Sequence, residues 1–305
     1  HSTQTPLVAE RFAEAFAAAG FPQGVFQYLH LTHASTEHLL QTAAIHHVVF
    51  TGSVDGGAQI ERATAGRFLN VGLELGGKDP AYIRADANLQ QAVETVIDGA
   101  FFNSGQSCCG IERIYVHEAI FDAFLDKAIT LVNQYQLGRS DDPKTTLGPM
   151  VRASSADAVR EQIHDALQQG AIAHVDTSRF PLDQPGSPYL APQLLTHVHH
   201  NMRIMSEETF GPVVGIMSVK NDDEAIQLMN DSEYGLTAAL FTQDIETGIQ
   251  LGHQINTGTF LINRCDYLDP ALAWTGIKKS GRGSSLSVIG YETLTRPKSF
   301  HIKKS

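Results

Sequence analysis

Two adjacent thiols stand out in a chain that contains only three cysteines. Cys108 and Cys109 lie in FFNSGQSCCG at 101–110, and the third is Cys265. A thiol becomes a strong nucleophile only as the thiolate, so its surroundings must stabilise negative charge. The turn GQS before Cys108 lets backbone N–H groups point at a sulfur or an oxyanion. Taken alone, the pair could be a redox couple, half of a metal site, buried core, or one nucleophile with a bystander.

A carboxylate is the second chemical group of interest. Glu74 lies in LELGGK, at the end of an apolar stretch and directly before two glycines. Partial desolvation there raises the pKa of a carboxylate toward the range useful for a general base. A thiol and a carboxylate at the ends of elements indicate a covalent thioester mechanism with base-assisted hydrolysis.

Elements that alternate in type must position these two groups. Apolar spacing, with Pro6 at the start and Gly20 past the end, predicts a helix over 6–19. The β-branched and aromatic runs GVFQYLHL (24–31), HHVVFTG (46–52) and FLNVGLEL (68–75) predict strands, with helices between them near 35–43 and up to about 65. This alternation is typical of a parallel sheet with helices on its faces.

The pattern continues to the closing strand. Asp86 is expected to cap a helix that runs through Phe102. The remaining predictions are strands at 113–117 and 257–263, helices at 119–136, 153–168 and 222–230, and a long surface loop at 176–192.

Composition excludes several classes of function. A net charge of −11 with scattered Lys and Arg argues against a nucleic-acid partner. No apolar run reaches the length of a membrane span, and we expect no secretory signal. Three cysteines make no disulfide framework, so we expect a reducing, cytoplasmic compartment. The fourteen histidines lack zinc-site spacing, so no metal is expected.

Five motifs occur in order across 50–283: FTGS, LELGGK, FFNSGQSCCG, EETFGPV and GIKKSGRG. Together they resemble the NAD(P)-dependent aldehyde dehydrogenase superfamily over essentially the whole chain. The resemblance implies an α/β fold in which a partial Rossmann-like cofactor lobe joins an α/β catalytic lobe with a parallel sheet. We expect 1–75 to be the C-terminal half of the dinucleotide-binding domain, 76–275 the catalytic domain, and 276–305 a return segment ending in an oligomerisation strand.

The resemblance also implies the roles of the two reactive groups. Cys108 matches the family nucleophile, and Cys109 is then the bystander, while Cys265 is expected to be packing or pocket wall. The thiolate attacks an aldehyde, hydride transfer to the cofactor leaves a thioester, and Glu74 activates the water that releases the acid. The backbone N–H of Cys108 supplies one oxyanion donor.

Cofactor and pocket residues follow from the same motifs. Gly52 and Ser53 match the start of a helix that meets a pyrophosphate. Glu208 matches the glutamate that binds the nicotinamide ribose, and Phe210 is the aromatic residue beside it. Lys78 is expected to tie the turn after Glu74. The expected pocket residues are Phe101, Phe102, Ser107, Cys109, Asn263 and Trp274, with a core role for Trp274 as an equal alternative.

The front of the chain departs from the family pattern. The N-terminal half of the cofactor lobe is not seen, and HSTQTP resembles the end of a KPS-E-xTP segment. Thr3 stands where that segment has a glutamate whose charge disfavours a 2′-phosphate, so we expect use of NAD or NADP. The segment LHLTHAST replaces the usual glycine-rich turn.

Three functions are therefore weighed. The first is an aldehyde dehydrogenase that forms a carboxylic acid and, by resemblance, assembles as a homodimer or homotetramer. The second is a truncated, catalytically impaired member that acts as a binding or assembly module. The third is a cofactor-independent thiol esterase that uses Cys108 and Glu74.

Overall fold

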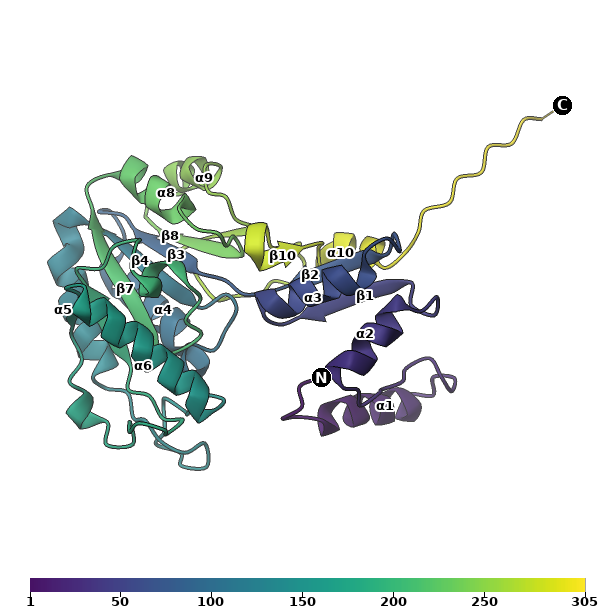
Figure 1. Cartoon of the computed structure of the whole chain (residues 1–305). Helices are drawn as coiled ribbons and strands as arrows, with labels where there is room; N and C mark the ends of the chain where they lie inside the picture. The colour runs from purple at the N-terminus through teal and green to yellow at the C-terminus, as the bar shows by residue number, and fades with distance from the viewer. Residues whose placement is uncertain (305) are drawn as a thin grey trace. The chain divides into compact units, whose positions relative to one another are not determined.

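The structure is a computed structural model that describes residues 1–304 (Figure 1). The chain divides into two compact units. One comprises His1–His47 with Gln59–Leu69, and the other comprises Val48–Ala58 with everything from Asn70 onward. The first unit contains the helices α1 (Leu7–Ala18) and α2 (His33–Gln41) and most of the second half of α3 (Val54–Thr64).

The larger unit is built on a seven-stranded sheet in the order β5-β6-β7-β4-β3-β8-β9. All of its strand pairs are parallel except β5 with β6. The strands are β3 (Asp79–Ile83), β4 (Ile111–His117), β5 (Ile172–Ala173), β6 (Gln193–Thr196), β7 (Val213–Val219), β8 (Thr237–Phe241) and β9 (Thr259–Ile262). The predicted α/β fold with a parallel sheet is confirmed.

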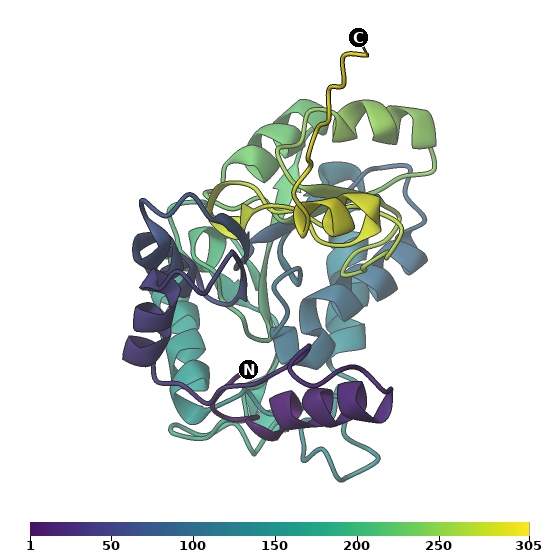
Figure 2. The same cartoon turned by 90° about the vertical axis from the view of Figure 1, so that its right-hand side faces the viewer.

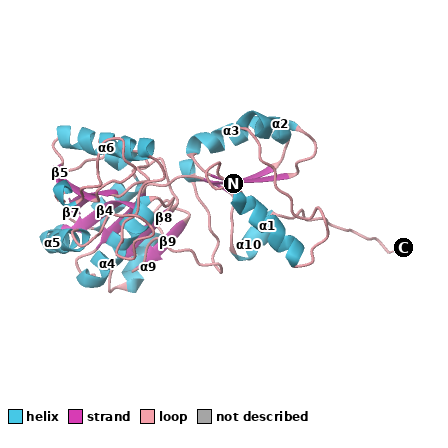
Figure 3. Ribbon diagram, turned by 90° about the horizontal axis from the view of Figure 1, so that it is seen from below, coloured by secondary structure: helices cyan, strands magenta, loops and turns pink. Residues whose placement is uncertain are grey.

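Helices cover both faces of this sheet. Figure 3 shows α6 (Ala153–Gln168) on one side of the strands and α4 (Leu89–Phe101) on the other. Helix α5 (Phe121–Val132) packs with α4, and its Phe124, Ala128 and Val132 are fully buried. On the opposite face α7 (Arg203–Ser206), α8 (Asp222–Asn230) and α9 (Ile245–Gly252) contribute buried side chains to a second cluster. Strand β4 is buried along Ile111–Val116, and this burial includes its two charged residues, Glu112 and Arg113.

A small three-stranded sheet, in the order β1-β2-β10, carries the LELGGK segment. Its strands are β1 (His47–Thr51), β2 (Asn70–Glu74) and β10 (Gly281–Arg282), and β10 pairs antiparallel with β2 so that Gly281 lies opposite Glu74. The last helix, α10 (Ser287–Thr293), follows β10. This sheet brings the end of β2 together with a segment two hundred residues away in sequence.

Two local predictions are wrong. Residues 24–31 form no strand, because nothing within 1–304 pairs with them, and Phe26 instead stacks on Phe16 with ring centroids 4.7 Å apart. Asp86 does not cap α4. Asn88 does, by accepting from Gln91 N at 3.2 Å, whereas Asp86 accepts from the backbone N–H groups of Gln243 and Asp244.

The residues after α10 form an extended segment (Figure 2). Within 1–304 this segment has no strand partner, and Phe300 and Ile302 are almost fully exposed. The oligomerisation strand therefore stays a prediction. Among residues 1–304, no helix is long and apolar enough to cross a membrane.

Candidate active site

The loop that carries Cys108 is fixed by its own side chains. It joins the end of α4 to β4 through a short 3-10 turn, Phe102–Gly105, in which Asn103 and Ser104 adopt left-handed φ angles of 50° and 58°. Gly105 also has a positive φ, and a Cβ there would stand 2.2 Å from the Gly211 carbonyl, so only glycine fits. Gln106 holds the loop because its Oε1 accepts from Val151 N at 2.7 Å.

The Glu74 carboxylate lies near a close backbone contact between Gly77 and the loop that carries Cys108. Glu74 ends β2, and Gly77 follows so closely against the nucleophile loop that a Cβ on it would stand 2.2 Å from the Cys108 carbonyl oxygen. The Glu74 side chain is half-buried, and this burial raises its pKa. Its Oε1 accepts a hydrogen bond from the Ser285 hydroxyl. The structure therefore brings Glu74 and Cys108 to one site.

The two thiols differ in character. A hydrogen bond from the Cys109 thiol lowers the pKa of Cys108, against burial and the charge of Glu74. Cys109 is buried, and its hydrogen bond to Cys108, its burial and Asp266 raise its pKa. Its Sγ also lies 2.9 Å from Asp266 Oδ1, so one S–H proton faces two acceptors. Cys108 is thus the more readily ionised thiol.

Glu208 is a second carboxylate at this site. Its Oε1 accepts from Gly77 N at 3.0 Å, and either oxygen would stand 2.4 Å from a Cβ on Gly76. Burial and the charge of Glu112 raise the pKa of Glu208 to about 7, although Gly77 N–H and Lys78 oppose the shift. The charge of Glu208 raises the pKa of Cys108 in turn, which places both carboxylates within electrostatic range of the sulfur.

The remaining predicted residues lie in different surroundings. Gly52 and Ser53 are exposed where α3 begins, and Ser53 Oγ accepts from Gly56 N at 3.1 Å as a helix cap. Phe210 is exposed next to Glu208, and Thr3 is exposed within its own unit. Lys78, expected to tie the turn, is fully buried and paired with Glu112 at 2.6 Å.

The predicted pocket residues differ in their exposure and in their hydrogen-bond partners. Phe102 is 61% exposed, and Ser107 donates to Asp266 Oδ1 at 3.0 Å. Trp274 is 6% exposed and packs in a cluster with Cys109, to which Cys108 is also adjacent. Asn263 pairs its amide with the backbone of Thr242 at 2.8 and 2.9 Å, so the amide joins β8 to β9 and a pocket role stays a prediction.

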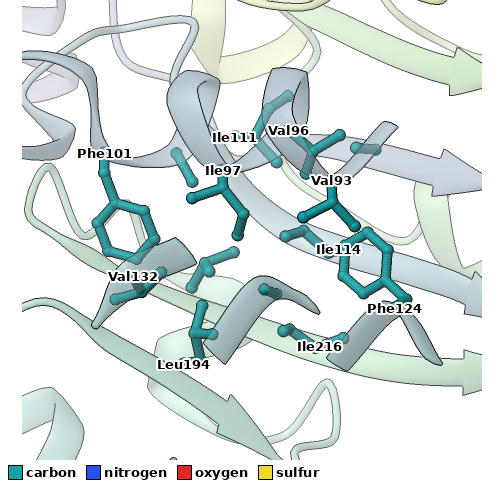
Figure 4. Packing of buried hydrophobic residues seen from close by; sticks show 14 of the residues in the cluster. Val93, Val96, Ile97, Phe101, Ile111, Ile114, Phe124, Val132, Leu194 and Ile216 are labelled. Atoms are coloured by element: carbon teal, nitrogen blue, oxygen red, sulfur yellow. The ribbon is translucent and has the colours of Figure 1, made fainter. Parts of the chain in front are cut away.

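Phe101 corrects an expectation. It lies in the hydrophobic core at 2% exposure, and Figure 4 shows it among Ile97 and Val132. The turn at Asn103 and Ser104 follows it, so Phe101 and Phe102 face opposite environments. Cys265 is packing, as one alternative held, because its Sγ donates to Thr95 O at 3.2 Å.

Sequence reasoning missed three residues at the site: Glu112, Ser285 and Asp266. Glu112 carried a weak signal, as an acidic residue beside Arg113 in a strand whose other residues are mostly apolar. Ser285 and Asp266 carried none, since each meets its partner across more than 150 residues. Among residues 1–304 no group of three or more His, Cys, Asp or Glu is arranged to hold a metal ion.

A thiol of lowered pKa, flanked by two partly buried carboxylates in an α/β fold, defines a cysteine-centred site. The aldehyde dehydrogenase family model matches residues 1–300, and the chain belongs to this family. It is 35% identical over 300 residues to an aldehyde dehydrogenase of Agaricus bisporus, covering 98% of this chain and 59% of that protein. It is 33% identical over 290 residues to succinate-semialdehyde dehydrogenase [NADP(+)] 1 of Mycobacterium ulcerans, covering 95% of this chain and 63% of that protein.

Solved structures agree with this assignment. The chain matches betaine aldehyde dehydrogenase of Staphylococcus aureus in complex with NAD+, with a TM-score of 0.87 and 32% identity, covering 94% of this chain and 58% of that one. The aldehyde-dehydrogenase-like fold is therefore confirmed. The chain spans about 60% of the length of the curated relatives that it matches.

Proposed function

We propose that the intact protein containing this chain oxidises an aldehyde to a carboxylic acid with NAD or NADP. The observation that carries this proposal is the contact of Gly77 with the Cys108 carbonyl, because it brings the end of β2 and its Glu74 beside the nucleophile loop. Residues 1–75 would form half of a dinucleotide-binding domain, and 76–275 the catalytic domain.

Cys108 is the proposed nucleophile. Its thiolate is stabilised by the Cys109 thiol and by its own backbone N–H, both of which lower its pKa. Attack on the aldehyde carbonyl forms the C–S bond and leaves an oxyanion, to which the N–H of Cys108 would donate a hydrogen bond. Loss of hydride from this thiohemiacetal converts it to a thioester.

Glu74 is the proposed base for the second half of the reaction. Its raised pKa makes it a better proton acceptor than an exposed carboxylate. It takes a proton from water as the hydroxide attacks the thioester carbonyl, and the C–S bond then breaks to release the acid and regenerate Cys108. The presence of a carboxylate at position 74 favours hydrolysis of the thioester over transfer to another acceptor.

Residues suited to a dinucleotide are present in the chain. Gly52 and Ser53 are exposed at the start of the eleven-residue helix α3, where backbone N–H groups and the helix dipole favour phosphate. A Cβ on Gly52 would stand 2.6 Å from the Phe50 ring, so a larger residue there would require that ring to move. Glu208 and Phe210 would hold the nicotinamide end. NAD or NADP, when bound, supplies the hydride acceptor.

The relatives support this reading of the cofactor. One is named for NADP+ and one solved relative holds NAD+. We further propose a cytoplasmic homodimer or homotetramer, for which the exposed Phe300 and Ile302 provide apolar surface. Sedimentation of the intact protein measures the assembly.

Aldehyde-dependent formation of NAD(P)H, measured at 340 nm, tests the function. We expect activity with at least some members of an aldehyde panel, and its loss in Cys108→Ala but not in Cys109→Ala. Cofactor that binds without turnover of any aldehyde would contradict the proposal. It would favour the binding-module alternative, and ester cleavage without cofactor would favour the esterase.

A further inference from the structure

A buried ion pair lies behind the site. Lys78 Nζ is 2.6 Å from Glu112 Oε2, and the two residues are only 1% and 4% exposed. Lys78 belongs to the segment after Glu74, and Glu112 belongs to β4, four residues after Cys108. Burying two charges is costly unless each is paired and hydrogen-bonded, so this pair depends on its remaining partners.

Those partners are backbone amides of the segment Glu208–Phe210, which we call the strap. Glu112 Oε2 accepts from Thr209 N at 2.8 Å, and Oε1 accepts from Phe210 N at 2.8 Å. Both oxygens of one carboxylate thus hold two successive N–H groups. The fit is geometric as well as electrostatic, because the oxygens match the spacing of neighbouring amides.

Lys78 completes the same arrangement. Its Nζ donates to Thr209 Oγ1 at 2.9 Å, and that hydroxyl donates to Gln162 Oε1 at 2.9 Å. The carbonyl of Lys78 accepts from Arg113 Nε at 2.8 Å, so β4 holds the segment through its backbone too. The Lys78–Glu112 ion pair therefore links three parts of the site: the segment after Glu74, strand β4 and the strap.

The strap needs such support. Phe210 has a φ of 51°, a left-handed conformation that is unfavourable for a residue other than glycine. Such residues persist where the surroundings over-determine them. With the backbone of Thr209 and Phe210 held by Glu112, the Glu208 side chain accepts from Gly77 N at 3.0 Å.

We propose that Glu112 is a positioning residue that sets the strap so that Glu208 and Phe210 are presented to the nicotinamide end of the cofactor. This inference rests on the proposed function. It assigns Glu112 a role in cofactor affinity that a buried ion pair serving stability alone does not have. Glu112 has no hydrogen bond to Cys108, so thiol chemistry should be spared.

Three variants separate these roles. Glu112→Asp keeps the charge beside Lys78 but, one methylene shorter, does not span both amides. Glu112→Gln keeps the length but turns an NH₂ group toward the donors. Glu207→Gln is the matched control, because this exposed neighbour of the strap pairs only with Arg203.

The experiment measures the Kd of NAD and NADP by quenching of protein fluorescence in the intact protein, alongside the rate of Cys108 alkylation by iodoacetamide. We expect Glu112→Asp and Glu112→Gln to raise the Kd at least tenfold while alkylation changes less than threefold. Glu207→Gln should match wild type in both measurements.

A folded Glu112→Asp or Glu112→Gln protein whose Kd stays within twofold of wild type overturns the inference and leaves the proposed function intact. A wild-type protein that binds neither dinucleotide overturns both. Should the single variants fail to fold, Lys78→Met with Glu112→Gln removes both buried charges, and native affinity in that double variant would equally overturn the inference.

Discussion

Gly77 and Cys108 touch through their backbones: a Cβ on Gly77 would lie 2.2 Å from the Cys108 carbonyl oxygen. Contacts of this kind between two buried backbone segments have no flexible side chain to yield. The contact sets the separation between the segment that follows Glu74 and the loop that carries the thiol. Glycine at 77 is therefore a requirement of the site's geometry.

We predict that Gly77→Ala lowers kcat/KM at least a hundredfold, because shifting a reacting group by about 1 Å costs that much. Overpacking should also lower the free energy of unfolding by about 1–3 kcal/mol. Gly72→Ala is the control, since its Cβ would meet nothing nearer than 3.9 Å. Steady-state kinetics and urea denaturation measure both effects. Native kinetics in Gly77→Ala would show that the contact is dispensable.

The two cysteines give a second prediction. The Cys109 thiol lowers the pKa of Cys108 by hydrogen bonding, so Cys109→Ala should raise it and leave less thiolate at pH 7. We expect the alkylation rate of Cys108 to fall roughly three- to tenfold at pH 7 and to recover at pH 9. Cys265→Ala serves as control because its thiol bonds to Thr95 O. An unchanged pH profile in Cys109→Ala would rule out this role for the second thiol.

Sequence periodicity located the elements of the large unit well. The helices predicted at 153–168 and 222–230 coincide with α6 and α8, because each presents a clear apolar face. The run at 24–31 misled because its aromatic residues satisfy strand propensity without a hydrogen-bonding partner. Propensity describes a side chain, whereas a strand also needs a neighbour.

The residues of the site also differ in how well the sequence could predict them. Glu74 and Cys108 could be nominated because glycines and apolar runs surround them locally. Glu112 could not, since its function depends on Thr209 and Phe210, about a hundred residues away. Phe101 was misplaced because the turn that separates it from Phe102 adopts left-handed φ angles at two residues other than glycine, Asn103 and Ser104.

Glu208 gives a prediction about pH and stability. Its pKa is raised to about 7 by burial and Glu112, so below pH 7 the folded protein holds a proton that the unfolded chain releases above its usual value of 4.5. The stability from this proton is fully present below pH 4.5 and is lost as the pH rises through 7. Glu208→Gln should therefore exceed the wild-type free energy of unfolding by about 2–3 kcal/mol at pH 8 and by less than about 1 kcal/mol near pH 5.

The free energy of unfolding, measured across pH 5–8, checks this difference. Glu208 also interacts electrostatically with Lys78, Cys108 and Tyr234. Glu207 pairs with Arg203 instead, so Glu207→Gln measures the effect of removing an acid that lies outside this group. Equal stability of Glu208→Gln and wild type at pH 8 would contradict a raised pKa at this position.

Thr3 gives a prediction about the cofactor. We propose that Thr3 stands at the adenosine ribose, where a neutral side chain would impose no repulsion on a 2′-phosphate, and we therefore expect the intact protein to use both dinucleotides. Ratios of kcat/KM for NAD and NADP measure the preference, and Thr3→Glu should lower the value for NADP selectively. A wild-type preference for NAD above a hundredfold, about 2.7 kcal/mol, would defeat the prediction.

Ser285 gives the last prediction, which concerns the proposed base. Its hydroxyl donates to Glu74 Oε1, and its backbone is fixed by two hydrogen bonds with Trp274, at 2.7 and 2.8 Å. Trp274 packs in a cluster with Cys109, and Cys108 packs against that cluster. The Trp274–Ser285 pair therefore lies beside both the Cys108 loop and the Glu74 carboxylate. A hydroxyl donor stabilises the ionised carboxylate and thus opposes the burial that raises the pKa of Glu74.

Removing that donor in Ser285→Ala should raise the pKa of Glu74 further, by an amount worth about 1 kcal/mol. Because the base acts only when unprotonated, the rate of thioester hydrolysis should fall several-fold at a pH below the pKa of Glu74 and approach the wild-type rate well above it. Ser284→Ala is the control, since its hydroxyl contacts only the carbonyl of Ser285. Single-turnover kinetics separate acylation from hydrolysis, and a defect in acylation alone would show that Ser285 acts on Cys108 instead of Glu74.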